Sequence, residues 1–253
     1  MDGSSVVRGL LVRGLLVGLA AGLLAFAVAV AVGEGPVQQA IDFEDLLVQR
    51  SGDAAGPELV SRDVQSTLGL LIGTVALAVA LGGIFALVYA YVYGRVGAAG
   101  PRVTAAVLAA GAFVTITLVP FTKYPANPPA VGDPATLDQR TLLFFTMIAI
   151  TVLAAVAATR IRAQLLGRVG AWDATILAGA LFLAVVVVAQ LVLPAVHELP
   201  AGFPADVLYR FRVASIGISA TMWLTIGLAF GAAAERLLTP VHRRSPVDVT
   251  PAP

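Results

Sequence analysis

The sequence contains no cysteine, one lysine and two histidines among its 253 residues. The absence of cysteine excludes a disulfide framework, a thiolate metal site and a thiol nucleophile. Charged residues make up only 12% of the chain, which is about half the share that is usual in globular proteins. A water-soluble core cannot enclose so much apolar surface, whereas a lipid bilayer can cover it. We therefore expect an integral membrane protein.

The apolar residues, which account for 58% of the chain, are gathered into long runs. Six of these runs come close to the roughly 20 residues that a helix needs to cross the hydrocarbon layer. They lie at residues 10–32, 68–93, 103–121, 142–159, 174–193 and 213–234. The sequence therefore predicts an all-α, polytopic bundle of six transmembrane helices in residues 10–238. Residues 1–9 form a short N-terminus, and the proline-rich tail at 239–253 is expected to be disordered.

Arginine and lysine are divided unevenly between the two sets of connecting segments. The N-terminus, residues 94–102, residues 160–173 and the C-terminal tail hold ten of the 16 cationic side chains, and the other connections hold six. The positive-inside rule therefore places both termini in the cytoplasm of a bacterial cell and residues 121–141 outside its plasma membrane.

A competing interpretation concerns the first apolar run, which ends in an Ala-x-Ala pattern typical of signal-peptide cleavage and would then leave five spans. However, this run is longer than a usual signal core. Gly14, Gly18 and Gly22 also recur every four residues along it. Such spacing lets two helix backbones approach closely and favours a retained packing helix.

The chain also contains an internal likeness. GRVGA occurs at 94–98 and again at 167–171, and each copy is followed by an apolar run, a proline and a proline-rich loop. Arg140 follows the first of these loops, and Arg210 and Arg212 follow the second. We interpret the chain as three similarly oriented helical hairpins, the last two duplicated, with sites expected at the repeat interface. Chance likeness among helices rich in alanine, glycine and valine is the alternative.

The polar stretch KYPANPP, residues 123–129, interrupts the apolar runs. Proline fixes its own φ angle, lacks an N–H group and keeps the preceding residue out of the α region. The stretch therefore predicts a helix end and a rigid, extended loop, produced by Pro120, Pro125, Pro128 and Pro129. Lys123 and Tyr124 are suited to anchoring this loop at the membrane interface. A helix stop with an ordinary interfacial Lys/Tyr pair is the simpler interpretation.

Three segments resemble the CbtA family, the proposed cobalt-transporter subunit of bacteria: LLVRGLLVGLAAGLLAFAVAVAVGEGPVQQAIDFE, LVPFTKYPANPPAVGDP and LPAVHELPAGFPADVLYRFRVAS. The resemblance covers about residues 6 to 238, and KYPANPPAVGDP is its most specific part. It implies a membrane subunit for cobalt uptake linked to cobalamin synthesis, with Co²⁺ as substrate and a small, single-span CbtB-like partner. A homo-oligomer is a further expectation. The alternatives are a non-conducting membrane scaffold and a permease for another small solute.

The candidate metal contacts lie in the segments expected outside the membrane. Asn127 and Asp133 in one loop, and His197 and Glu198 in the next, offer oxygen and nitrogen ligands that suit a divalent ion. We expect KYPANPP to fold over the mouth of the bundle and bring these four residues together. The supporting charges are Arg140, Arg210 and Arg212. The alternative is that Glu198 and Asp133 simply pair with these arginines or with Lys123.

Enzymatic patterns are missing from the sequence. The spans contain no carboxylate and no histidine, the usual marks of a cation path through a membrane. There is no H-E-x-x-H metal helix, no phosphate-binding glycine loop and no Ser/His constellation. We expect neither an enzyme, nor a tightly bound cofactor, nor a nucleic-acid partner.

The topology can be tested with single cysteines, because the chain has none of its own. In intact cells, Ala126→Cys should react with a membrane-impermeant thiol reagent, whereas Ala98→Cys should react only after the cells are opened. Mass spectrometry of the labelled protein measures both. Labelling of position 98 but not of position 126 from outside would reverse the orientation.

Overall fold

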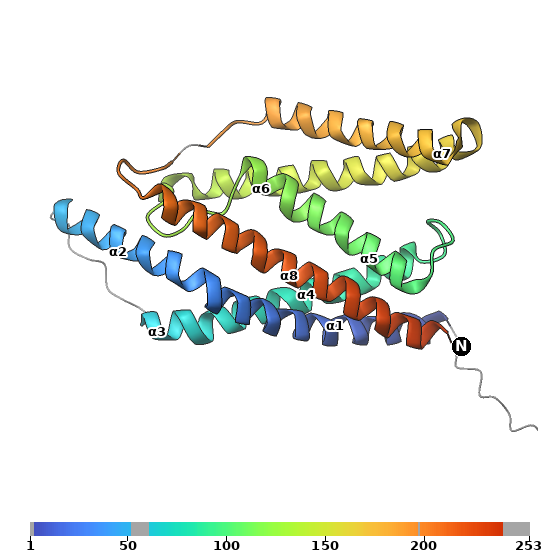
Figure 1. Cartoon of the computed structure of the whole chain (residues 1–253), viewed down its shortest axis with the longest axis horizontal. Helices are drawn as coiled ribbons and strands as arrows, with labels where there is room; N and C mark the ends of the chain where they lie inside the picture. Colours follow the sequence, from blue (N-terminus) through green and yellow to red (C-terminus); the bar gives the residue numbers. More distant parts are fainter. Residues whose placement is uncertain (1–2, 52–60, 197, 240–253) are drawn as a thin grey trace, which may run out of the picture.

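The computed structural model describes residues 3–51, 61–196 and 198–239, and every regular element within these ranges is a helix. His197 and, apart from Thr239, the expected tail lie outside the described residues. The helices run alternately between two ends of an elongated bundle (Figure 1). We call one end the terminal end, because it holds Gly3, Thr239, residues 93–100 and the turn at Gly170. The other, the loop end, is formed by residues 121–136, 193–196 and 198–204.

The first long helix extends far beyond its expected span. It comprises α1 (Gly3–Val28), the π-helical segment η1 (Ala29–Gly33) and α2 (Glu34–Ser51). The expectation of a loop from residue 33 onward is therefore wrong as far as Ser51. An interior proline leaves the carbonyl four residues earlier without its helical partner. For Pro36 that carbonyl belongs to Val32, inside η1, so the wider π turn lies where the α-helical bond is missing and the helix continues.

The second and third long helices follow the expected spans more closely. The second comprises α3 (Arg62–Val64), η2 (Gln65–Gly69) and α4 (Leu70–Val92), and the third comprises α5 (Pro101–Ala112), η3 (Phe113–Leu118) and α6 (Val119–Lys123). Pro120 does not end the third helix, contrary to expectation. The carbonyl that it leaves without a partner belongs to Ile116, inside η3, and the helix continues to Lys123. The residue before Pro125 then leaves the helical region, with Tyr124 at φ −123° and ψ 71°.

Five helices, not the expected six, are long and apolar enough to span a membrane in the described chain. The expected spans 142–159 and 174–193 both lie in α7 (Leu137–Val192), which follows the short 3-10 helix η4 (Pro134–Thr136). As one straight rod, the 56 residues of α7 would be about 84 Å long. Gly170, with φ 84° and ψ 169°, instead breaks α7 into two arms that lie side by side (Figure 1). Arg162 Nε donates to Thr175 Oγ1 across this turn at 2.8 Å.

The packed centre of the bundle is formed by α1, α4, α5 and α8 (Ala205–Leu238). Tyr89 and Phe230 are fully buried there, with their ring centroids 5.0 Å apart. By contrast, α7 packs against η3, α6 and η4. Its second arm runs along the outer side of the first (Figure 1). The last expected hairpin, made of the spans 174–193 and 213–234, is therefore not a packed pair, although its two helices do run in opposite directions.

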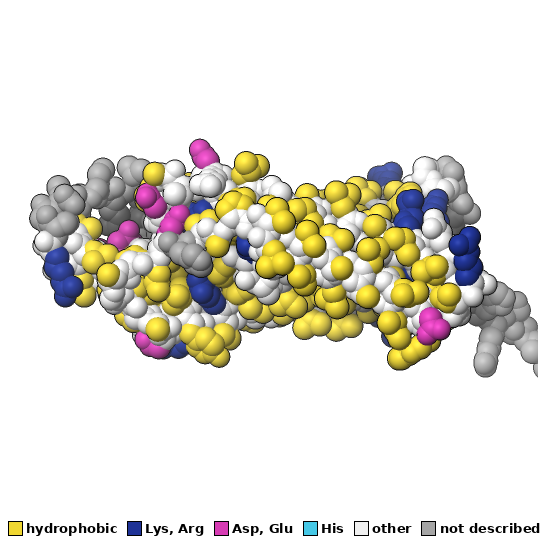
Figure 2. All heavy atoms as spheres, turned by 90° about the horizontal axis from the view of Figure 1, so that it is seen from above, with side chains coloured by type: hydrophobic (Ala, Val, Ile, Leu, Met, Phe, Trp, Pro, Cys, Tyr) yellow, Lys and Arg dark blue, Asp and Glu magenta, His cyan; other side chains and the backbone are white. Residues whose placement is uncertain are grey.

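The surface and the interior both agree with a membrane bundle. Figure 2 shows hydrophobic side chains along the middle of one face, with most of the charged side chains toward the two ends. Inside, Gly14, Gly18 and Gly22 face α4, where an added Cβ would overlap backbone or side-chain atoms of α4. For Gly22 it would lie 2.6 Å from Val75 Cα. These glycines let α1 and α4 approach to backbone contact.

The contact between α1 and α4 can be tested from the α4 side. A Cβ at Gly82 would lie 2.9 Å from Gly18 Cα, whereas a Cβ at Gly73, in the same helix, meets nothing within 4 Å. Gly82→Ala should therefore lower the free energy of unfolding by about 1–3 kcal/mol, the usual cost of overpacking. Gly73→Ala should be neutral or slightly stabilising, because alanine favours helix. Reversible unfolding in mixed micelles measures both, and equal effects would contradict the close approach.

Candidate functional site

Two loops meet at the loop end and contain the same kind of turn. Val131 N–H donates to the Pro128 carbonyl, and Phe203 N–H donates to the Pro200 carbonyl, each at 3.2 Å. In both turns the residue before the donor has a positive φ, 64° at Ala130 and 83° at Gly202. Val131 and Phe203 are then buried in one small cluster with Ala40 and Val207. The two loops are thereby seated on α2 and α8.

Lys123 and Tyr124 bind the end of α7. The Gln190 carbonyl would ordinarily accept from the N–H of residue 194, but that residue is a proline and has none. Lys123 Nζ donates to this carbonyl instead. Tyr124 Oη donates to the Pro194 carbonyl at 2.8 Å, and Gln190 Nε2 donates to Thr122 Oγ1 at 2.7 Å. The start of KYPANPP is thus tied to the second arm of α7.

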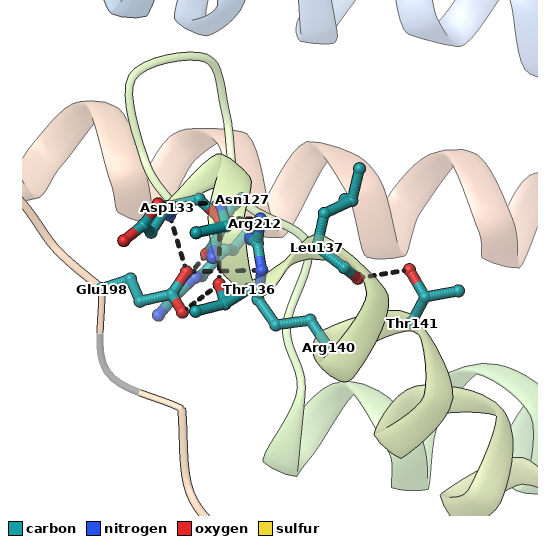
Figure 3. Close-up of polar contacts among 9 residues, drawn as sticks. Asn127, Asp133, Thr136, Leu137, Arg140, Thr141, Glu198 and Arg212 are labelled. Atoms are coloured by element: carbon teal, nitrogen blue, oxygen red, sulfur yellow. Dashed lines mark hydrogen bonds and ion pairs between the residues drawn. The ribbon is translucent and has the colours of Figure 1, made fainter.

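Glu198 is the acceptor at the centre of the contact between the loops (Figure 3). It accepts hydrogen bonds from Thr136 Oγ1 and from Asp133 N–H, the latter at 2.9 Å. It also forms an ion pair with Arg140, whose Nε lies 3.3 Å from Oε2. The Thr136 hydroxyl, then the Asp133 amide, and then the charge of Arg140 lower the pKa of the Glu198 carboxyl below 4.5.

A second arginine makes the reciprocal contact. Arg212, on α8, donates from Nη2 to Asn127 Oδ1 at 3.0 Å. Arg140 follows the first loop in the chain and binds Glu198 in the second. Arg212 follows the second loop and binds Asn127 in the first. Arg210 is not part of this contact, since it binds Asp206 at 3.0 Å and Gln39 at 2.6 Å. The Asp133 carboxylate accepts from Ala135 N–H at 2.8 Å and caps η4.

A cavity of about 920 Å³ lies between KYPANPP, the start of α7 and the start of α8. The polar residues nearest the loops are Lys123, Asn127, Arg140, Glu198 and Arg212. Other residues of the lining carry hydroxyl groups and aromatic rings, among them Thr117, Thr141, Ser215, Ser219, Phe121 and Phe144. Thr117 Oγ1 also accepts from Trp223 Nε1 at 3.2 Å, so its hydroxyl is oriented by α8.

Three of the four expected metal contacts, Asn127, Asp133 and Glu198, lie at the loop end, while His197 is not described. Glu198 is contacted by the backbone N–H of Asp133, whose carboxylate instead caps η4. Among the described residues, no group of three or more His, Asp, Glu or Cys side chains is placed to hold a metal ion. Both oxygens of Glu198 already accept hydrogen bonds or an ion pair. Metal binding by these residues stays a prediction.

Several residues of the site were not found by reading the sequence. Thr136 binds Glu198, Gln190 binds Lys123, and the hydroxyls of Ser215 and Ser219 line the cavity. For Gln190 a signal existed, because a proline four residues later leaves its carbonyl in need of another donor. The hydroxyls carried no such signal, since serine and threonine are common packing residues in transmembrane helices.

Comparison with known proteins gives one result at the level of the family. The model of a family described as "Probable cobalt transporter subunit (CbtA)" matches residues 7–235. No curated protein matches the chain, and no solved structure matches it.

The Glu198 contact should make loop stability depend on pH. Because its pKa is lowered by folding, the ionised carboxyl stabilises the folded state above pH 4.5, and this contribution is lost as the pH falls through the lowered pKa. The difference in unfolding free energy between the parent chain and Glu198→Gln should therefore be constant near neutral pH. It should shrink below pH 4.5. A difference that stayed unchanged down to acid unfolding would contradict the assignment.

Proposed function

Because this chain belongs to the CbtA family of probable cobalt transporter subunits, we propose that it is the membrane subunit of a cobalt-uptake system that supplies cobalamin synthesis. The family match carries this proposal, because it runs from residue 7, inside the first long apolar helix, to residue 235, inside the fifth, and includes both loops of the loop end. In this proposal Co²⁺ is the substrate, both termini face the cytoplasm and the cavity opens to the outside.

The shape of the loop end supports a transport role. The cavity reaches from the loops to residues inside the long helices, among them Thr117, Ser215 and Ser219. It is bounded in part by the π-helical segment η3, whose Thr115 carbonyl accepts from Thr151 Oγ1 of α7 at 2.6 Å. π-helical turns of this kind occur frequently at functional sites. A recess that lies at one end of the bundle and is bounded by its long helices suits a transport protein.

We also propose a partner within the membrane. The second arm of α7 lies at the outer side of the bundle (Figure 1), and its large apolar residues are strongly exposed, Leu191 to 79% and Val192 to 73%. A bilayer covers such a surface, and so does another helix. A small single-span CbtB-like subunit fits the family description of a subunit, and a second copy of the chain is the other candidate.

A scaffold role is the second candidate function. It is favoured by the contacts of Glu198, whose oxygens are already bound by Thr136, Asp133 and Arg140. In that case the polar residues of the loop end order the protein surface and do not meet a solute. Transport measurements separate the two roles.

Uptake of labelled Co²⁺ tests the proposed function. Cells that express the chain together with a single-span partner should accumulate the ion well above cells with an empty vector, and cells with the partner alone should not. Immunoblots of membrane fractions control for expression. Uptake at vector level by cells that contain both proteins in the membrane would refute cobalt transport and leave the scaffold role.

A further inference from the structure

The polar lining of the cavity near the loops is predominantly cationic. It carries three cations, Lys123, Arg140 and Arg212, and one carboxylate, Glu198. That carboxylate is paired with Arg140. In the part of the chain that the structure describes, no carboxylate lies within 4.0 Å of Lys123 Nζ or of the Arg212 guanidinium. Two positive charges at the cavity are therefore left without an ionic partner.

The partners that these two side chains do have are neutral. Lys123 donates to the backbone carbonyl of Gln190, and Arg212 donates to the side-chain amide of Asn127. Arg212 is partly buried, and its Nε is shielded from solvent without a hydrogen-bond acceptor among the described residues. Burial of a charge is costly unless the charge is paired. Where a native structure contains such a group, a bound ion or water usually explains it.

The nearby carboxylates are engaged elsewhere. Asp206 pairs with Arg210, and Asp133 caps η4 through Ala135 N–H. Neither Asp206 nor Asp133 lines the cavity. The charge that would balance Arg212 is thus not supplied by the acidic residues next to it in the fold.

We propose that this cavity binds a small oxyanion with at least two negative charges, a carboxylate or phosphate compound. The planar guanidinium of Arg212 matches the geometry of both groups, and Lys123 adds a point charge. Asn127 uses Oδ1 as the acceptor for Arg212, so its Nδ2 is left to donate to an anion. Ser219 contributes a hydroxyl group to the same lining. The hydroxyls of Thr141 and Ser215 also line it, but they donate to the Leu137 and Phe211 carbonyls.

The size of the cavity agrees with this ligand class. At about 920 Å³ it lies within the range of roughly 300–1,000 Å³ that is usual for small-molecule sites. Phe121 and Phe144 line it beside the hydroxyl groups, so it offers an apolar wall next to its charges. A bare divalent cation would instead be repelled by the excess of positive charge. This cavity is therefore not the place where the proposed transport would bind free Co²⁺, and oxyanion binding and cobalt transport can be tested separately.

Calorimetric titration of the purified chain in lipid nanodiscs at low salt tests the proposal. Citrate and inorganic phosphate are titrated separately, so that the carboxylate and phosphate sources are distinguished. Saturable binding of at least one is expected. Arg212→Gln and Lys123→Gln should each weaken it by about 10-fold or more. Arg210→Gln is the matched control, two residues from Arg212 on α8 but bound to Asp206, and should change binding by less than about 2-fold.

A variant that removes a negative charge from the cavity lining gives a further test. Glu198→Gln removes the one carboxylate of the lining and should leave oxyanion binding as tight or make it tighter. Arg212→Lys keeps the positive charge but loses the planar guanidinium, and it should weaken binding less than Arg212→Gln does. If Arg212→Gln does not fold, as judged by gel filtration and circular dichroism, Lys123→Gln and Glu198→Gln decide the question.

Three results would overturn the proposal. The first is that the folded parent chain shows no saturable binding of either probe. The second is that Arg212→Gln or Lys123→Gln binds the probe as Arg210→Gln does. The third is that Co²⁺ alone binds, more tightly in Arg212→Gln and not at all in Glu198→Gln, which would make the cavity a cation site. Since the titration needs no uptake, cobalt transport can fail while oxyanion binding persists, and the reverse also holds.

Discussion

The crossed contact between the two loops is the interaction on which the loop end depends. Arg140, at the beginning of α7, binds Glu198 in the loop before α8, and Arg212, near the beginning of α8, binds Asn127 in the loop before α7, and so the two contacts hold the loops together. The cavity lies between these same residues. The contact also matters for α7, which is joined to the rest of the bundle through η3, α6 and η4 and has few contacts with the packed centre. Charge-assisted hydrogen bonds are suited to this task because they are both strong and directional.

Much of the architecture could be predicted from composition and pattern alone. The apolar runs marked the helices, and the glycines of the first run lie at the contact with α4. The predicted helix ends were wrong where a neighbouring segment compensates for a residue that ordinarily ends a helix. Pro36 and Pro120 should interrupt their helices, but each follows a π-helical segment that contains the carbonyl it leaves free. Likewise, the connection expected at 160–173 is helical apart from Gly170, which turns the chain back between the two arms of α7 that contain the expected spans 142–159 and 174–193.

The candidate site was predictable only in part, for a different reason. Asn127, Asp133 and Glu198 were expected at one end of the bundle, and they meet there. Their partners depend on contacts between residues far apart in the chain, such as Thr136 with Glu198, which periodicity does not encode. The two loops share their turn, with Ala130 and Gly202 at equivalent places. The helices around them are packed differently, so a likeness in sequence was retained in the loops and not in the surrounding bundle.

Lys123 has a practical consequence that follows from its being the only lysine. Apart from the N-terminus, the protein carries a single primary amine, and that amine is partly buried where KYPANPP meets the end of α7. An amine-reactive reagent therefore has one side chain to modify. Its rate of reaction reports how often Lys123 leaves the Gln190 carbonyl, so the unaltered protein contains its own chemical reporter of loop opening.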